Sequence, residues 1–374
     1  MSIRQHNLGS IVKPGFNALG PQTSTTLYNL YSWGQNTSGQ LGLGDVTGRS
    51  SPNAVGALVN WLDIACGRYH SMATKIDGTL WTWGQNLNGR LGLGDTANRS
   101  SPVQVGALTT WAKISGISCT IATKTDGTLW SWGLNTAGQL GLGNTTAYSS
   151  PKQVGALTTW LAVASGIYNT IATKTDGTLW AWGNNASGQL GLGNTTNYSS
   201  PKQVGALTTW STIAAGYNQT LAIKTDGTLW AWGNNGVGQL GLSNVTYYSS
   251  PKQVGALTSW LKITGGEYHT VAIKTDGTLW AWGRGNDGAL GLGNTTNYSS
   301  PKQVGSLATW LKIAGGEYNT IATKTNGTLW GWGRNNSGQL GVGDTTGRSS
   351  PVQVGATTTW GAIAGGGNFT LALG

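Results

Sequence analysis

The feature that most constrains this chain is an internal repeat that occurs seven times. A Trp-Gly pair followed by a run similar to Gly-Gln-Leu-Gly-Leu-Gly returns every 49 or 50 residues. The Trp residues of these pairs are Trp33, Trp83, Trp132, Trp182, Trp232, Trp282 and Trp332. Repeats of this length that contain several short β-patterned runs cannot bury their apolar faces alone and must pack in series. We therefore expect an all-β fold, a closed seven-bladed β-propeller with four-stranded blades.

Each repeat contains four runs with the composition of short strands. In the repeat that ends at residue 333 they are residues 301–305, 310–315, 320–324 and 328–333, with Gly, Asn or Asp between them. An Asp-Gly pair, such as Asp226-Gly227, supplies the positive φ angles of a two-residue primed turn between the third and fourth runs. Pro is expected to open the first strand, where its missing N–H does least harm.

The two ends of the chain complete each other. Residues 370–374 match the third run of the preceding repeat, so the last repeat stops before its hairpin turn, while residues 30–34 match a fourth strand. We expect residues 27–374 to form the propeller, with a seventh blade built from about residues 351–374 plus 27–34. Closure by an N-terminal strand removes the open sheet edges that invite aggregation.

The loop before each Ser-Pro pair divides the repeats into two groups. Four repeats carry Tyr and then, four residues later, Lys, whereas three carry Arg at the Tyr position and no Lys. The three Arg repeats are neighbours only on a closed ring, where they would form one sector. We regard the basic residues as candidate contacts for a partner; they are Arg49, Arg99, Lys152, Lys202, Lys252, Lys302 and Arg348.

These repeats resemble those of the regulator of chromosome condensation family. The resemblance rests on Trp182-Gly183, residues 188–193, Ser200-Pro201, residues 213–216 and residues 224–227, and it extends from about residue 27 to the end. It implies a seven-bladed propeller. The founding member exchanges guanine nucleotides on a small GTPase through elements that interrupt its repeats, but no spacing here exceeds 50 residues. Since one propeller scaffold carries many activities, the resemblance indicates fold more than function.

A plant ultraviolet-B photoreceptor of similar fold uses a Trp in a Gly-Trp-Arg-His-Thr motif. The corresponding positions here carry no Trp; they are Arg68, Ile117, Ile167, Tyr217, Glu267, Glu317 and Gly367. We therefore do not expect light sensing. The 20 Trp residues are interpreted as packing between blades, with each indole N–H bonded to a carbonyl; a stacking surface for sugars or bases is the alternative.

The charge and the cysteine content restrict the partners and the compartment. The 22 basic and 12 acidic residues give a net charge of +10, and most of the excess is expected as a ring of one base per blade. Nucleic acid is therefore not an expected partner, because its binding sites usually cluster basic residues. Neither a membrane span nor a standard secretion signal is expected. Cys66 and Cys119 occupy different repeat positions, so we predict free, buried thiols.

Few residues suit catalysis. The only histidines are His6, His70 and His269, and no metal, cofactor or enzymatic activity is expected. The most enzyme-like group combines Glu267, Tyr268 and His269 with Glu317 and Tyr318 of the next repeat. These positions vary between repeats, as residues of loops or of a central channel do.

Surface residues are copied between repeats as well as core residues, for example in residues 194–200 and 294–300. An enzyme needs one asymmetric site, whereas copied surfaces favour a structural tile or a multivalent binder, in which weak equivalent sites gain avidity. Asn, Thr and Tyr in these loops are compatible with glycan contacts or with ordinary turns.

Residues 1–26 lie outside the repeats and are expected to form an extended arm. Pro14 prevents a long helix, and the apolar residues Ile11, Val12, Phe16 and Leu19 are unusual for a purely solvated tail. These five residues are candidate partner contacts, either to the same propeller or to a neighbouring subunit. The arm also resembles the leaders of phage structural proteins.

Three hypotheses follow. The favoured one is a non-enzymatic virion or surface-assembly component, located in the virion, that is anchored to capsid or tail subunits, or to further copies, by the arm. The second is a multivalent glycan-binding or host-attachment module. The third is a soluble partner-binding propeller that regulates a GTPase, with one asymmetric epitope between Glu267 and Tyr318.

Overall fold

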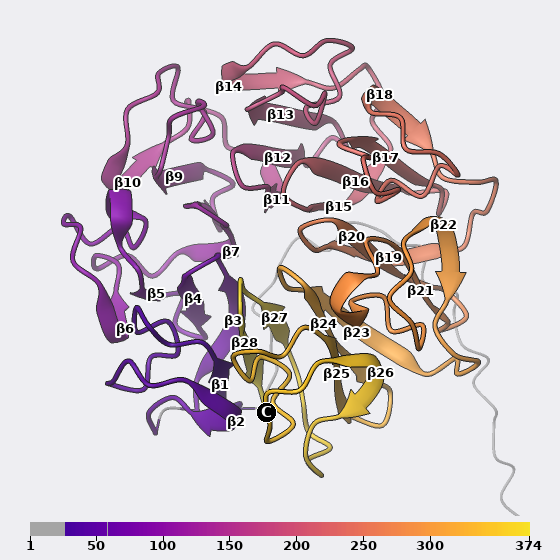
Figure 1. Ribbon diagram of the computed structural model, residues 1–374. Helices are drawn as coiled ribbons and strands as arrows, with labels where there is room; N and C mark the ends of the chain where they lie inside the picture. Colours follow the sequence, from indigo (N-terminus) through magenta and orange to yellow (C-terminus); the bar gives the residue numbers. More distant parts are fainter. Residues whose placement is uncertain (1–26, 58) are drawn as a thin grey trace, which may run out of the picture.

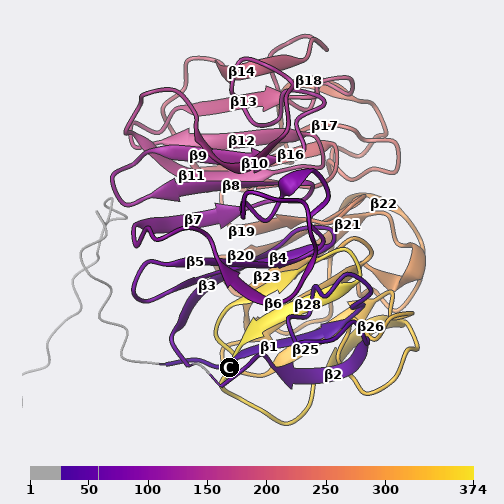
Figure 2. The same cartoon turned by 90° about the vertical axis from the view of Figure 1, so that its left-hand side faces the viewer.

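The computed structural model describes residues 27–57 and 59–374, which form seven four-stranded antiparallel sheets around one axis (Figure 1). Strands β1 to β28 contain three to six residues each. In the blade formed by residues 160–203, for example, strands β11 to β14 run side by side, as the view turned by 90° shows (Figure 2). The predicted closed seven-bladed propeller is therefore confirmed.

The blades are numbered here by the order of their first strands. Blade 1 holds β3 (Trp61–Cys66), β4 (His70–Lys75), β5 (Leu80–Gly84) and β6 (Arg99–Gln104). Blade 2 holds β7 (Trp111–Ser115), β8 (Cys119–Lys124), β9 (Leu129–Gly133) and β10 (Tyr148–Gln153). Blade 3 holds β11 (Trp160–Ser165), β12 (Asn169–Lys174), β13 (Leu179–Gly183) and β14 (Tyr198–Gln203). Blade 4 holds β15 (Trp210–Ala215), β16 (Gln219–Lys224), β17 (Leu229–Gly233) and β18 (Tyr248–Gln253).

Blade 5 holds β19 (Trp260–Gly265), β20 (His269–Lys274), β21 (Leu279–Gly283) and β22 (Tyr298–Gln303). Blade 6 holds β23 (Trp310–Gly315), β24 (Asn319–Lys324), β25 (Leu329–Gly333) and β26 (Arg348–Gln353). Blade 7 holds β27 (Ile363–Gly365), β28 (Phe369–Leu373), β1 (Leu30–Gly34) and β2 (Arg49–Ala54). Two short 3-10 turns, η1 (Leu87–Gly89) and η2 (Asn286–Gly288), lie in the loops before the rim strands of blades 1 and 5. Within the described residues, no helix has the length and apolar character needed to cross a membrane.

The first strand of each blade lies nearest the axis and the fourth lies on the rim (Figure 1). The grouping of strands differs from the prediction, because residues 298–303 form the rim strand of blade 5 and do not start the next blade. The loop of residues 284–297 returns the chain to the free edge of β21, where β22 pairs. Pro301 therefore lies inside an edge strand, at an irregularity in the ladder, and does not open a strand.

The closing blade also differs from the expected division. It combines two C-terminal strands with two N-terminal strands, because the rim strand that contains Pro351 belongs to blade 6. Strand β28 pairs with β1 over its whole length, from Leu30 opposite Leu373 to Gly34 opposite Phe369. The ring is thus closed in the middle of a sheet, by one ladder of five residue pairs.

The hairpin between the second and third strands is longer than a two-residue primed turn. In blade 4, Gly227 N–H donates to Lys224 O at 2.9 Å, and Lys224 N–H donates to Thr228 O at 3.0 Å, so the loop holds three residues. Gly227 has a φ of 77°, whereas Asp226 is not among the described residues with positive φ. Asp226 instead accepts hydrogen bonds from the N–H and hydroxyl of Thr228. This is the turn-plus-bulge type of three-residue hairpin.

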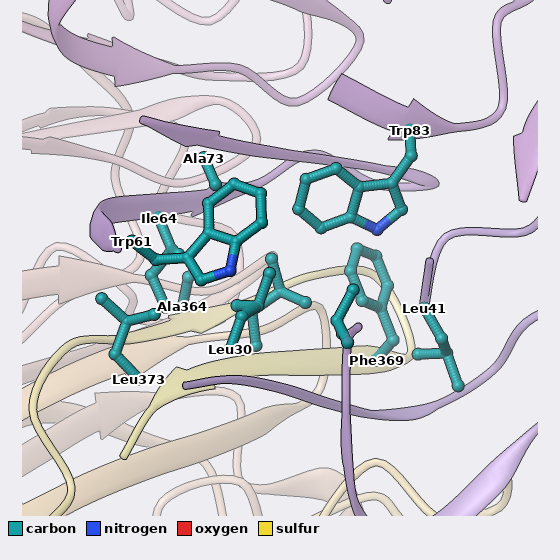
Figure 3. Close-up of a cluster of buried hydrophobic side chains, with 11 residues drawn as sticks. Leu30, Leu41, Trp61, Ile64, Ala73, Trp83, Ala364, Phe369 and Leu373 are labelled. Atoms are coloured by element: carbon teal, nitrogen blue, oxygen red, sulfur yellow. The ribbon is translucent and has the colours of Figure 1, made fainter. Parts of the chain in front are cut away.

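The core consists of seven clusters, one at each blade junction. Figure 3 shows the junction of blades 7 and 1, where Leu30 and Phe369 pack against Trp61 and Trp83. In each third strand the Trp of the Trp-Gly pair is buried. In six blades its indole N–H donates to a carbonyl of the preceding blade, as Trp232 Nε1 does to Gln189 O at 3.0 Å. The interpretation of these residues as blade-to-blade packing is confirmed. The expected carbonyl bond is not general, because Trp81 and its equivalents donate to a Thr hydroxyl, and Trp61 and its equivalents have no partner among the described residues.

Both cysteines are free, as predicted. Cys119 is buried in β8, and burial raises the pKa of its thiol to about 12. Cys66 lies at the axial end of β3, and its Sγ is 3.4 Å from Ala364 O of the neighbouring blade. A thiol that is protonated at neutral pH is a poor nucleophile, so these residues serve packing.

Candidate functional site

The turns that connect the first and second strands meet around one end of the axis. Their backbones form a ring, in which Arg68 N–H donates to Ile117 O at 2.9 Å and Gly367 N–H donates to Arg68 O at 3.2 Å. The ring encloses a small cavity of about 40 Å³, lined by Arg68, Ile117, Tyr217, Glu267, Glu317 and glycines that include Gly367. We call this end the axial mouth. Its backbone repeats from blade to blade, but its side chains do not.

An ion pair spans the axial mouth. Arg68 Nη2 of blade 1 lies 2.8 Å from Glu317 Oε1 of blade 6, and the Arg68 guanidinium lies 5.6 Å from the centre of the Tyr217 ring. Blade 7 lies between the two charged residues and contributes Gly367. A Cβ at that position would come within 2.5 Å of Arg68 O and 3.2 Å of Glu317 Oε2. The absence of a side chain at residue 367 therefore leaves room for the pair.

Several polar atoms at the axial mouth have no protein partner among the described residues. They are Arg68 Nε, Tyr217 Oη, Glu267 Oε2 and Glu317 Oε2. Burial raises the pKa of Glu317, Arg68 lowers it, and the neighbouring Glu267 raises it further. Burial also raises the pKa of Tyr217. A polar cavity of this size can hold ordered water, which would satisfy these atoms.

Next to the mouth, blades 5 and 6 carry two Tyr and two Arg residues. Arg334 lies 3.7 Å from the centre of the Tyr318 ring, and Arg284 lies 5.1 Å from the same ring and 5.8 Å from that of Tyr268. Arg334 also forms an ion pair with Asp287 at 3.0 Å. Burial and the adjacent Glu267 raise the pKa values of both tyrosines. We call Tyr268, Arg284, Tyr318 and Arg334 the Arg-Tyr cluster.

The Arg-Tyr cluster is a local departure from the repeat. At the position of the two arginines the other five blades carry uncharged residues, namely Gln35, Gln85, Leu134, Asn184 and Asn234. Sequence reasoning identified Glu267, Tyr268, Glu317 and Tyr318 but missed both arginines. The available indication was the change from Asn or Gln to Arg directly after Trp-Gly in two adjacent repeats.

The most enzyme-like group of the sequence is not assembled around its histidine. His269 is buried in β20, where its Nε2 lies 3.1 Å from Thr320 Oγ1 of the next blade. Burial lowers the pKa of His269 to about 4. His70 has the same arrangement with Thr120, and burial lowers its pKa as well. Both imidazoles therefore serve the junctions between blades.

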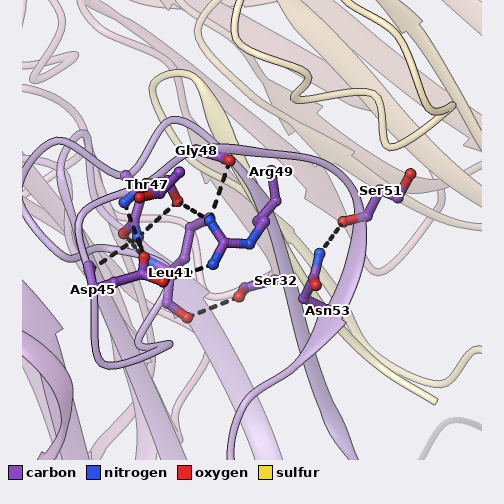
Figure 4. Close-up of polar contacts among 9 residues, drawn as sticks. Ser32, Leu41, Asp45, Thr47, Gly48, Arg49, Ser51 and Asn53 are labelled. Carbon is purple, nitrogen blue, oxygen red and sulfur yellow. Dashed lines mark hydrogen bonds and ion pairs between the residues drawn. The ribbon is translucent and has the colours of Figure 1, made fainter.

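The basic residues on the rim do not form a uniform ring. Arg49 pairs with Asp45 at 2.6 Å (Figure 4), and Arg99 and Arg348 make equivalent pairs with Asp95 and Asp344 at 2.5 and 2.6 Å. The predicted sector is confirmed, because these pairs lie in blades 7, 1 and 6, which are consecutive.

The four rim lysines have a different environment. Each stands over the Tyr of its own strand, with Nζ 5.4 to 5.6 Å from the ring centre; they are Lys152, Lys202, Lys252 and Lys302. None of them has an acidic partner within the described residues. The expected ring of rim charge is therefore wrong: the unpaired charge lies on an arc over blades 2 to 5, because aspartates neutralise the other sector.

The remaining predicted contacts, Ile11, Val12, Pro14, Phe16 and Leu19, lie outside the described residues. Sequence reasoning also missed the other end of the axis. There the residue two positions after Trp61 and after each of its equivalents differs between blades: Asp63, Lys113, Ala162, Thr212, Lys262, Lys312 and Ala362. Variation at this one position within otherwise similar runs was the available indication.

Comparisons with known proteins agree with this architecture. A family model described as the RCC1-like domain matches residues 29–372. The structure of human WBSCR16 is 21% identical, has a TM-score of 0.83, and the match covers 92% of this chain and 98% of that chain. Prp20p from Saccharomyces cerevisiae is 21% identical and has a TM-score of 0.83, and the match covers 94% of this chain and 92% of that chain. Yeast RCC1 (Prp20) bound to Kap60 is 20% identical and has a TM-score of 0.85, and the match covers 100% of this chain and 96% of that chain. A comparison with curated proteins finds no match.

Proposed function

This chain belongs to the RCC1-like domain family, and from that membership we propose that it is a non-enzymatic interaction propeller that binds a protein partner through the axial mouth and the Arg-Tyr cluster. The observation that carries the proposal is the Arg-Tyr cluster itself. Copied repeats provide a uniform scaffold, and this cluster gives two adjacent blades a surface that the other blades lack.

The chemistry of the cluster suits a protein interface. Tyr and Arg are enriched at the centres of such interfaces, because each combines a large contact area with polar groups that fix orientation. Arg284 has no acidic partner within the described residues, so its guanidinium can meet a carboxylate of the partner. Tyr268 and Tyr318 are half-buried, which limits the entropy lost on binding.

Two solved structures of similar fold agree with a binding role. The study of Prp20p describes its binding properties to Gsp1p and histones, and yeast RCC1 (Prp20) was crystallised with Kap60. These partners belong to those proteins. For this chain they favour a protein partner in general, and regulation of a GTPase is one form that such binding can take.

The other two hypotheses have less support. The virion or surface-assembly role depends on residues 1–26, which lie outside the described structure, and the three similar structures named above are of human and yeast proteins. A glycan-binding role would use the copied loops. There Asn194 Nδ2 already donates to Tyr198 Oη at 3.4 Å, and Lys202 stands over the Tyr198 ring, so these groups support the loop itself.

Comparative affinity capture tests the proposal. Full-length protein, the variant Arg284→Ala/Tyr318→Ala and the variant Tyr168→Ala are immobilised and exposed to a lysate of the cells that produce the protein. Tyr168 is the matched control, because it is an exposed Tyr at the same repeat position in a blade that carries Asn184 in place of Arg. We expect wild type and Tyr168→Ala to retain the same partner in similar amounts, and we expect the double variant to retain about tenfold less of it.

Equal capture by all three proteins would contradict the proposal. A partner recovered in this way is then purified, and its affinity for the three proteins is measured directly. Loss of binding with Tyr168→Ala alone would place the epitope on another blade.

A further inference from the structure

The end of the channel opposite the axial mouth forms a second cavity. It has a volume of about 350 Å³ and is lined by Thr212, Lys262 and Lys312 together with Ala362 and three isoleucines, Ile263, Ile313 and Ile363. The strand register places it at the opposite end from the mouth, because Lys312 pairs with Thr323 near the hairpin turn, whereas Gly315 pairs with Thr320 near Glu317. The two cavities are therefore separate. We call this one the lysine pocket.

The two lysines of the pocket occupy equivalent positions in adjacent blades and are held in the same way. Lys262 Nζ donates to Leu311 O at 2.6 Å, and Lys312 Nζ donates to Gly361 O at 2.8 Å, in each case in the next blade. An ammonium group has three donors, so each retains two for a ligand. The backbone carbonyls thus fix both charges at the wall of one cavity.

The positive charge of the pocket is only partly balanced. Among the described residues at this end of the channel Asp63 is acidic; its carboxylate lies 3.7 Å from Lys113 Nζ, and, against the lowering by burial, its charge also raises the pKa of Lys312. Burial lowers the pKa of Lys262, and the charge of Lys312 lowers it further. Two like charges held side by side in a partly desolvated cavity repel each other, and a bound anion would relieve this repulsion.

The pocket is also a departure from the repeat. At the same repeat position blades 3, 4 and 7 carry Ala162, Thr212 and Ala362, and in blades 3 and 4 the inner strand forms around this position without a lysine. A residue that the fold does not require, placed twice in neighbouring blades at the wall of a cavity, indicates a use other than packing.

We propose that the lysine pocket binds a small organic anion, whose phosphate or carboxylate group lies between Lys262 and Lys312 and whose uncharged body contacts the three isoleucines. A volume near 350 Å³ is at the lower end of the range for small-molecule sites. Lysine ammonium groups bind such oxyanions as point charges, and Thr212 adds a hydroxyl for orientation. This site does not depend on the partner proposed for the other end of the axis.

Isothermal titration calorimetry on the full-length protein, at pH 7 and about 0.15 M salt, tests the proposal. The probes are inorganic phosphate, pyrophosphate and citrate, which separate phosphate from carboxylate preference. The test variant is Lys262→Thr/Lys312→Ala, which introduces the residues that blades 4 and 7 already carry. The control is Lys202→Asn/Lys302→Asn, which removes the same number of charges on the rim, at a repeat position where blade 7 carries Asn53.

We expect saturable binding of at least one probe to the wild type, reduced about tenfold or more by the test variant and changed less than about twofold by the control. Probe-dependent stabilisation in thermal unfolding provides a second measurement, and the single variant Lys312→Gln is used if the double variant unfolds. Absence of saturable binding of all three probes up to about 10 mM, or equal weakening by the test and control variants, would overturn the proposal.

Discussion

Arg68 and Glu317 are 249 residues apart in sequence, yet Arg68 Nη2 lies 2.8 Å from Glu317 Oε1 across the blade that closes the ring. Blade 7 consists of strands from both ends of the chain, so this pair connects the blades on either side of the closure. The Glu317 side chain is 4% exposed and that of Arg68 is 34% exposed. The carboxylate of this pair is therefore much better shielded from water than those of the rim pairs, which are 41 to 45% exposed.

Loss of Arg68 should destabilise the propeller. Arg68→Met retains the alkyl stem but leaves Glu317 as a buried carboxylate without its cation, and we expect the free energy of unfolding to fall by about 2 kcal/mol. Urea unfolding followed by tryptophan fluorescence measures the change. Arg99→Met is the control, because the exposed Arg99–Asp95 pair should contribute less than about 1 kcal/mol. Equal effects of the two substitutions would contradict the special role of the axial pair.

Acid should destabilise the protein in two stages. Buried His70 and His269 have folded-state pKa values below the ordinary 6.5, that of His269 at about 4, so they favour folding at neutral pH. As the pH falls from 6.5 towards 4 the unfolded chain binds protons that the folded protein cannot, and stability falls by roughly 1.4 kcal/mol per pH unit for each His. Below about pH 3.8 the loop and turn carboxylates, such as Asp226, add a second loss, because hydrogen bonds from Thr228 lower the folded-state pKa of Asp226.

His269→Asn separates the two stages. Asn319 occupies the equivalent position in blade 6 and is buried there, so the substitution suits the site. We expect similar unfolding free energies for wild type and variant at pH 8, and a difference of roughly 3 kcal/mol in favour of the variant to develop by pH 4. If the unfolding free energy of the variant falls with pH between 6.5 and 4 as steeply as that of the wild type, groups other than His269 cause the loss.

Much of the fold could be predicted from the sequence, because the repeat copies its Trp-Gly pair and its strand pattern seven times. The errors concern which strands pair. The spacing of Pro301 and Trp310 along the chain is the same whether residues 298–303 start a new blade or complete the preceding one; only the long loop before Tyr298 decides the matter. The turn type was missed because Asp-Gly is compatible with two hairpins, and the Asp226 contacts with Thr228 select one.

The candidate site was only partly predictable. Glu267 and Glu317 stand out in the sequence because their position varies between repeats. The partner of Glu317 is Arg68, whose place beside it depends on ring closure and on Gly367. The neutralisation of Arg49 by Asp45 also needed the loop geometry, since a separation of four residues means contact in one loop conformation and not in another.

The indole hydrogen bonds give a matched comparison between two blades. Trp232 Nε1 donates to Gln189 O at 3.0 Å, whereas Trp132 Nε1 is buried with no partner among the described residues. Substitution by Phe removes similar volume at both sites. We expect Trp232→Phe to lower the unfolding free energy by about 1 kcal/mol more than Trp132→Phe, because only the former loses a hydrogen bond. The difference is modest, since Thr220 Oγ1 still donates to Gln189 O at 2.8 Å.

Thermal and urea unfolding of both variants measures this comparison. A third variant, Trp282→Phe, should behave like Trp232→Phe, because Trp282 Nε1 donates to Gln239 O at the same distance of 3.0 Å. Identical losses for Trp132→Phe and Trp232→Phe would show that packing alone sets the contribution of these residues.

The pairing in the closing blade leads us to expect that the chain tolerates circular permutation. Asn29 N–H donates to Gly374 O at 3.0 Å and Gly374 N–H donates to Asn29 O at 3.1 Å, so the two segments are paired where the other blades have a hairpin loop. A circular permutant that joins Gly374 to Asn29 through Thr-Asp-Gly, with new termini in residues 304–309, should fold with an unfolding free energy within about 1 kcal/mol of a version that starts at residue 29. A permutant with its new termini inside β25 should not fold and should show no cooperative unfolding transition, because this strand pairs with a neighbour on both sides. Circular dichroism and urea unfolding compare the proteins. If the loop permutant is unfolded while the version that starts at residue 29 folds, the Asn29–Gly374 pair is not equivalent to the hairpin of the other blades.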